Sequence, residues 1–121
     1  MKEQKLTKVD LQQFTGTEQW YHHPIVRKVF YTDGIRYMAE MGEAYWLINE
    51  IAFLQEQPQI ARTEFQRWIL QVNLEESTAI LSCDDGNGRI LHSKKIEYTD
   101  FPLDEIKIYV ANKVMLLPSE Y

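Results

Sequence analysis

The most apolar stretch of the chain spans residues 43–57, and its pattern predicts a helix. Apolar side chains recur there at helical spacing and form a stripe of Ala44, Leu47, Ile48, Ile51 and Leu54. Further apolar residues widen this stripe around the helix: Tyr45, Trp46, Ala52 and Phe53. A helix that is apolar on nearly every side is typical of a protein interior. We therefore expect it in the middle of the fold, with the other elements packed around it.

Two shorter helices are predicted before this one. Thr7 is a suitable N-cap and Asp10 follows three residues later, which indicates a short helix that continues to about residue 14. Thr32 or Asp33 is expected to cap the second of these helices.

The second helix is predicted over residues 35–41, and Gly42 is expected just beyond its C-terminal end. Residues 17–23 should be extended, because the residue before Pro24 avoids the helical region. Residues 25–31 fit a strand and a helix equally well.

Beyond Pro58 the spacing of apolar residues changes from helical to alternating, which is typical of half-buried strands. The expected strands are residues 67–74, 79–83, 89–98, 106–110 and 114–117. Asn87 and Gly88 form the preferred pair for a type I′ turn between the second and third of these strands. Residues 111–113 are expected to turn the chain between the last two.

Helices followed by alternating strands indicate an α+β fold. We expect one domain over residues 1–121, with a helical part at about 7–57 and a sheet part at about 65–117. The N-terminal helices should pack on one face of a four- to five-stranded antiparallel meander sheet.

Composition excludes some classes of protein and disfavours others. Cys83 is the only cysteine of 121 residues, so no disulfide can form within the chain, and this fits a reducing cytoplasm. Residues 1–6 lack the apolar core of a signal peptide, and no apolar run reaches the length of about 20 residues that crosses a bilayer. A net charge of −5 disfavours binding to nucleic acids and to acidic membranes.

The sequence Asp85-Gly86-Asn87-Gly88-Arg89-Ile90 matches the centre of a calcium-binding loop. The first ligand position of that loop falls on Cys83 and the last on Lys94, where calcium requires a glutamate. We therefore interpret residues 85–90 as a polar hairpin turn and expect neither a metal site nor a cofactor.

Cys83 and His92 should face each other across this hairpin. A thiol needs a nearby base or positive charge to act as a nucleophile, so the pair is a candidate catalytic site. No third group supports that reading, and free cysteine is usually buried. We favour a structural role.

The other candidate catalytic residues are Glu50, His22, His23 and Asp33. Adjacent histidines on a strand point to opposite faces, so His22 and His23 are poor joint ligands for a metal ion. Glu50 would be the central carboxylate if these groups converged in one pocket.

The candidate ligand-binding residues are Tyr45, Trp46, Asn49 and Glu50. Asn49 and Glu50 are the polar interruptions of the apolar helix, and we expect them to mark its solvent-facing strip. If they are instead covered, Tyr45 and Trp46 could form the wall of a pocket beside them. Five more aromatic residues could line a pocket or pack in the core, which we favour: Trp20, Tyr21, Phe30, Tyr31 and Tyr37.

Apolar residues are also expected on the sheet face that the helices leave uncovered: Ile69, Ile80, Leu91 and Tyr109. Such residues on an open face suggest a partner surface. We expect a homodimer or another protein partner to bind there.

Four strings of the sequence resemble an uncharacterised family of short bacterial proteins, known only as a domain of unknown function. They are residues 14–21, 31–40, 44–52 and 117–121. The resemblance implies a bacterial cytosolic protein and assigns no chemistry or site residue. The function is therefore unknown from sequence; we favour a non-catalytic binding or interaction module over a small enzyme, and a nucleic-acid-associated regulator is the third alternative.

Overall fold

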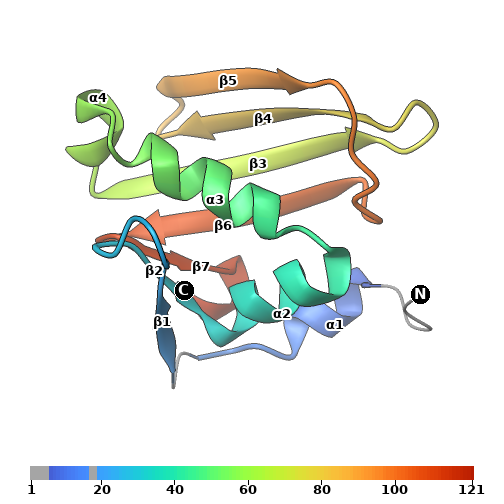
Figure 1. Ribbon diagram of the computed structural model, residues 1–121, viewed down its shortest axis with the longest axis horizontal. Coiled ribbons are helices and arrows are strands. Elements are labelled where there is room, and N and C mark those ends of the chain that lie inside the picture. Colours follow the sequence, from blue (N-terminus) through green and yellow to red (C-terminus); the bar gives the residue numbers. More distant parts are fainter. Residues whose placement is uncertain (1–5, 17–18) are drawn as a thin grey trace.

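The structure is a computed structural model that describes residues 6–16 and 19–121. Its two longest helices lie on one side of a seven-stranded sheet (Figure 1). The helices are α1 (Lys8–Gln12), α2 (Asp33–Gly42), α3 (Tyr45–Leu54), α4 (Pro58–Ala61) and the 3₁₀ helix η1 (Pro118–Glu120). The strands are β1 (Trp20–His22), β2 (Phe30–Thr32), β3 (Phe65–Asn73), β4 (Thr78–Asp84), β5 (Ile90–Ile96), β6 (Glu105–Ala111) and β7 (Val114–Leu116).

The order of strands across the sheet is β1-β2-β7-β6-β3-β4-β5. All neighbours are antiparallel except β2 and β7, which are parallel. The α+β class is confirmed, but the expected four- to five-stranded antiparallel meander is only part of the sheet. The chain forms a meander over β3, β4 and β5, and β6 then returns to the other side of β3. Strands β1 and β2 have three residues each, too few to show an alternating pattern in sequence.

One face of the long strands forms the core with the helices. The register places Trp68 of β3 between Cys83 of β4 and Ile108 of β6, and all three are buried. Buried Leu47, Ile48, Ile51 and Ala52 mark the inner side of α3. The two layers therefore share one hydrophobic core.

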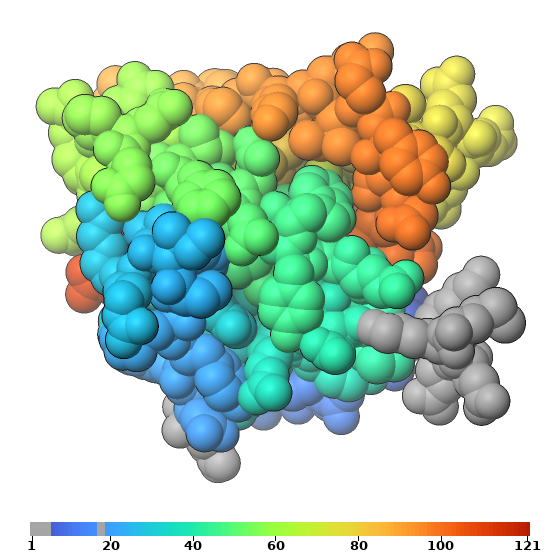
Figure 2. Space-filling view, viewed as in Figure 1, coloured from blue at the N-terminus to red at the C-terminus, as the bar shows by residue number. Residues whose placement is uncertain are grey.

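Contrary to our expectation, helix α3 does not have other elements packed all around it, and its open side is wider than the strip expected at Asn49 and Glu50. Tyr45 and Phe53 on its outer side are 40% and 46% exposed, and Asn49 is also exposed. In Figure 2 the green surface of this helix lies open between the blue N-terminal strands and the orange strand β5. Aromatic residues on the outer side broadened the apolar pattern without being buried. The fold consequently has two layers, and α3 is the outer layer over the middle of the sheet.

The N-terminal caps of α1 and α2 are among the residues predicted from the sequence. Thr7 and Asp10 form a reciprocal capping box on α1, and Thr32 caps α2 through the Ile35 N–H. At the end of α2 the left-handed residue is Glu43, with φ 51° and ψ 47°, and not Gly42. A Cβ atom at Gly42 would lie 2.8 Å from Phe101, so this glycine permits close packing between α2 and the loop before β6.

The hairpin between β4 and β5 differs from the predicted two-residue turn. Gly86 and Gly88 have positive φ angles of 85° and 93°, and the strand register shifts between Cys83 and Asp84. Asn87 does not adopt the positive φ that a type I′ turn at residues 87–88 requires. That geometry occurs at the β6–β7 turn instead, where Asn112 and Lys113 have φ angles of 55° and 72°.

Candidate functional site

The carboxylate and amide on α3 both have structural partners. Glu50 Oε2 accepts a hydrogen bond from Lys94 Nζ of β5 at 3.0 Å. Asn49 Oδ1 lies 2.8 Å from His23 Nε2. The two polar residues thus tie α3 to the strand at one sheet edge and to the loop between β1 and β2.

His23 is a buried structural residue. Its Nδ1 accepts hydrogen bonds from the backbone N–H groups of Ile25 at 3.2 Å and Val26 at 3.0 Å. Because Nδ1 is an acceptor, the ring carries its hydrogen on Nε2 and donates it to Asn49. The ring therefore fixes the loop after β1 onto α3, with Phe53 packed edge-on at 5.7 Å.

His22 and Asp33 are held by other partners. His22 is exposed, with Nδ1 2.8 Å from the carbonyl oxygen of Arg27 and its ring 4.3 Å from that of Phe30. Asp33 Oδ1 accepts a hydrogen bond from the Tyr21 hydroxyl at 2.7 Å. Glu50, His22, His23 and Asp33 therefore each contact a different part of the fold. Within residues 6–16 and 19–121, no group of three or more His, Cys, Asp or Glu side chains is placed to hold a metal ion.

Cys83 and His92 are direct cross-strand neighbours, as the sequence predicted. The thiol is buried and is directed at the carbonyl of Asp84, with Sγ 3.9 Å from that oxygen. Burial, with a smaller contribution from the charge of Asp84, raises the pKa of the Cys83 thiol to about 12. His92 Nε2 is buried and has no hydrogen-bond partner in the described part of the chain. The pair does not supply a thiolate at neutral pH.

This geometry predicts very slow alkylation of Cys83 in the folded protein. A pKa of about 12 instead of 9 lowers the thiolate fraction by about a thousandfold near pH 8. We expect iodoacetamide to modify the native protein at least about a hundredfold more slowly than the same protein unfolded in urea, followed by mass spectrometry. Replacing His92 with Ala should leave the native rate low. Equal rates for native and unfolded protein would show that Cys83 is an activated thiol.

Tyr45 and Trp46 have different surroundings. The Tyr45 hydroxyl donates to Glu40 Oε2 at 2.9 Å, and its pKa is raised by partial burial and by this hydrogen bond. Trp46 is partly buried against the hydrophobic core.

The loop at residues 85–89 uses its carboxylates to fix its own backbone. Asp84 Oδ1 accepts from the Gly86 N–H at 2.7 Å, and Asp85 Oδ1 accepts from the N–H groups of Asn87 at 2.8 Å and Arg89 at 3.1 Å. These backbone hydrogen bonds, that from Asn87 first, lower the pKa of Asp85. This is the polar turn that the sequence favoured over a calcium site.

The side of the sheet away from the helices has two different regions. In the region formed by β5, β4 and β3, Ile80 and Ile69 are surrounded by polar cross-strand neighbours: Lys95, Gln71, Ser82 and Lys107. Leu91 is not part of it, because it lies at the register shift and packs against the core. Tyr109 belongs to the second region, in which aromatic residues predominate.

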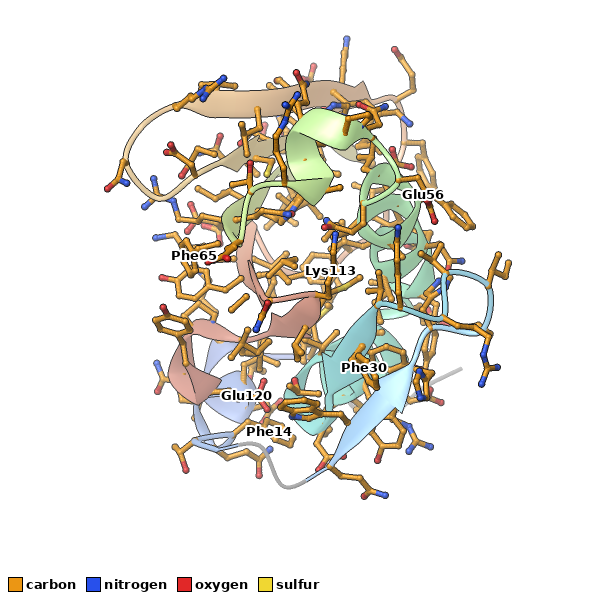
Figure 3. All side chains as sticks on the ribbon, turned by 90° about the vertical axis from the view of Figure 1, so that its left-hand side faces the viewer. Phe14, Phe30, Glu56, Phe65, Lys113 and Glu120 are labelled. Carbon is orange, nitrogen blue, oxygen red and sulfur yellow. The ribbon has the colours of Figure 1, made fainter. Side chains whose placement is uncertain are left out.

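This second region, which we call the aromatic corner, consists of Trp20, Phe30, Phe65, Tyr109 and Tyr121. The rings of Phe65, Tyr109 and Tyr121 are 5.1 to 5.5 Å apart, and those of Trp20 and Phe30 are 6.0 Å apart. Trp20 is 53% exposed and Tyr121 is 72% exposed. Figure 3 shows Phe65 on the side of the sheet away from α3.

A hollow of about 380 Å³ lies in the aromatic corner between Trp20 and Tyr121. Its apolar lining comes from Val114, Leu116 and Ala111. Of the corner residues, the sequence placed only Tyr109 on the open face, and core packing was favoured for Trp20 and Phe30, with a pocket as the alternative. Trp20 is instead exposed and lines the hollow, because the corner joins the short strands β1 and β2 to the chain around η1. The sequence signal that could have indicated this surface is the presence of Trp20 and Tyr121 in segments with no helical or alternating pattern.

Glu120 lines this hollow and is buried, and both of its carboxylate oxygens accept hydrogen bonds. Its Oε1 accepts from the Thr32 hydroxyl at 2.7 Å and from the Leu117 N–H at 2.9 Å, and its Oε2 accepts from the Gly34 N–H at 3.2 Å. The carboxylate therefore caps the N-terminus of α2 and fixes the segment that carries Tyr121.

The comparisons with known proteins give a family and no activity. No curated protein and no solved structure matches the chain. Among the helices of the described residues, each falls short of the length and apolarity needed to cross a membrane. The match to a family covers residues 5–121, almost all of the sequence. The chain therefore belongs to the family of unknown function DUF6876.

Proposed function

We propose that the protein is a small, non-catalytic interaction module of the bacterial cytosol, and that it self-associates through the open face of its sheet. The observation that carries this proposal is the aromatic corner. Two largely exposed aromatic side chains, Trp20 and Tyr121, flank a hollow with an apolar lining. Tryptophan and tyrosine beside a pocket are the residues that most often dominate the binding energy of protein interfaces.

The charges on the open face support a second copy of the chain as the partner. Lys107 and Lys95 lie on the same face as Glu105, and the Arg67–Asp84 ion pair lies between them and the corner. Because both signs are present, two copies related by a two-fold axis can place opposite charges together. A net charge of −5 opposes contact elsewhere on the surface, so a face with its own lysines is the favoured place for self-association.

The contacts of the candidate catalytic residues favour this function over an enzyme. Glu50, His23 and Asp33 each form a hydrogen bond that stabilises the fold. The net charge likewise gives no support to a nucleic-acid regulator.

Analytical ultracentrifugation of matched tyrosine variants tests the proposal. We expect the wild-type protein to dimerise at micromolar concentrations and Tyr121→Ser to weaken the dimer at least about tenfold. Tyr98→Ser is the control, because Tyr98 is 69% exposed in the segment after β5, compared with 72% for Tyr121. A wild-type monomer at high micromolar concentration, or equal effects of the two variants, would contradict self-association through the aromatic corner.

A further inference from the structure

A second hollow, of about 340 Å³, lies on the outer side of α2. It is lined by Phe14 and Tyr21 and by five residues of the helix: Asp33, Arg36, Tyr37, Glu40 and Met41. Its volume is at the lower end of the range for small-molecule sites, which indicates a ligand of about the size of an amino acid. We call it the α2 hollow.

Arg36 in the α2 hollow has no ion pair in the described part of the chain. Asp33 and Glu40 are three and four residues away, which is the spacing at which helix ion pairs usually form. Both carboxylates instead accept tyrosine hydroxyls, from Tyr21 at 2.7 Å and from Tyr45 at 2.9 Å. The guanidinium lies over the Tyr21 ring, 4.7 Å from its centroid.

These contacts leave a planar cation that is oriented by an aromatic ring and has no anionic partner among residues 6–16 and 19–121. A guanidinium held in this way presents a fork of N–H donors that matches a carboxylate. Asp33 and Glu40 each keep one carboxylate oxygen that accepts no hydrogen bond from the described residues, one on either side of Arg36 along the helix. Phe14 and Tyr37 provide an apolar wall, with their rings 5.2 Å apart.

The order of charges along α2 selects the class of ligand. A simple anion such as phosphate would be repelled by the two carboxylates, and a simple cation would be repelled by Arg36. A zwitterion satisfies both signs. We propose that the α2 hollow binds a free α-amino acid with an apolar side chain. Its carboxylate pairs with Arg36, its ammonium group with Asp33 or Glu40, and its side chain packs on Phe14 and Tyr37.

This proposal is independent of self-association, because Tyr21 and Trp20 are consecutive residues of β1 and point to opposite faces of the sheet. The protein could lose one property and keep the other. A loss of dimerisation and a loss of ligand binding are therefore separate results.

The test is a titration of the ¹⁵N-labelled full chain with L-phenylalanine, followed by NMR. We expect shifts for α2 residues, and at least about tenfold weaker binding of 3-phenylpropionate, which lacks the ammonium group, and of phenethylamine, which lacks the carboxylate. Arg36→Gln should weaken binding of L-phenylalanine to the same extent. Arg62→Gln, which changes an exposed arginine at the end of α4, should leave it unchanged.

Three outcomes would overturn the proposal. The first is the absence of shifts with both L-phenylalanine and L-leucine up to their solubility. The second is binding of either single-charge analogue as tight as that of the amino acid. The third is unchanged binding in Arg36→Gln. A circular dichroism melt of each variant shows that the fold is retained, which is expected because Arg36 is exposed.

Discussion

Replacing Glu120 with Ala is expected to lower the free energy of unfolding by about 3 kcal/mol. The substitution leaves the Thr32 hydroxyl and the backbone N–H groups of Gly34 and Leu117 without their acceptor, and Thr32 is fully buried. It also removes a negative charge from the N-terminus of α2. For a chain of this size the midpoint of thermal unfolding should fall by about 10 °C. Glu97→Ala, at an exposed site, should change it by less than about 2 °C.

A double-mutant cycle with Gly34 distinguishes loss of the cap from a general effect. Alanine normally favours a helix over glycine by about 1 kcal/mol. Here a Cβ at residue 34 would lie 2.6 Å from Glu120 Oε1 and 2.8 Å from Leu117 Cδ1, so Gly34→Ala should destabilise the protein. Its cost should be smaller in the Glu120→Ala background, where the carboxylate is absent. Additive effects of the two substitutions would refute the cap at this position.

Local signals in the sequence predicted the parts of the fold that depend on neighbouring residues. Thr7 with Asp10, and Thr32 before α2, are caps whose partners lie within three residues. The alternation of β3 and β4 likewise predicted which residues face the core. The pairing of Cys83 with His92 was predicted from a two-residue turn at Asn87 and Gly88; the pairing is confirmed, although that turn is not formed and the register shifts between Cys83 and Asp84. In each case the interacting residues are close in sequence, or the pattern is repeated along a strand.

Long-range contacts explain what could not be predicted. Strands β1 and β2 exist because β2 pairs with β7, more than eighty residues later. Gly42 suggested a left-handed residue, but its role is set by contact with Phe101 in a distant loop. Glu120 caps a helix that begins 87 residues earlier, since it bonds the Gly34 N–H and α2 starts at Asp33. A sequence without an alignment carries no signal for such pairs.

The candidate functional residues show the same contrast between local signals and long-range contacts. Residues chosen for their chemistry, such as Glu50 and His23, are used in contacts between elements. The surface aromatics and Arg36 are ordinary residues in sequence, and only the arrangement of β1, α2 and η1 brings them together around hollows. Residue type alone therefore identified polar contacts between elements more readily than it identified hollows on the surface.

Gln66→Leu is expected to cost about 3 kcal/mol of the free energy of unfolding, because Gln66 is the centre of a buried polar network. Its amide makes five hydrogen bonds of 2.7 to 3.0 Å: with both polar atoms of Gln55, with the Trp68 indole N–H, and with the carbonyls of Ile60 and Thr63. These bonds join the end of α3, the turn around α4 and the start of β3. Leucine fills a similar volume but leaves Gln55 Oε1 and the Trp68 N–H buried and unpaired, and Gln55 Nε2 keeps only its 3.4 Å hydrogen bond to the Ile51 carbonyl.

The matched substitution is Gln55→Leu, which is also buried but removes fewer bonds, and it should cost less, about 2 kcal/mol. Because the two amides are each other's partners, the double variant should be at least about 1 kcal/mol more stable than the sum of the single effects predicts. Urea unfolding followed by tryptophan fluorescence measures all three, since Trp68 reports directly on the network. If the effects add, the two glutamines are not coupled. The link between α3 and β3 would then depend on apolar packing alone, and the buried amides would be tolerated and not required.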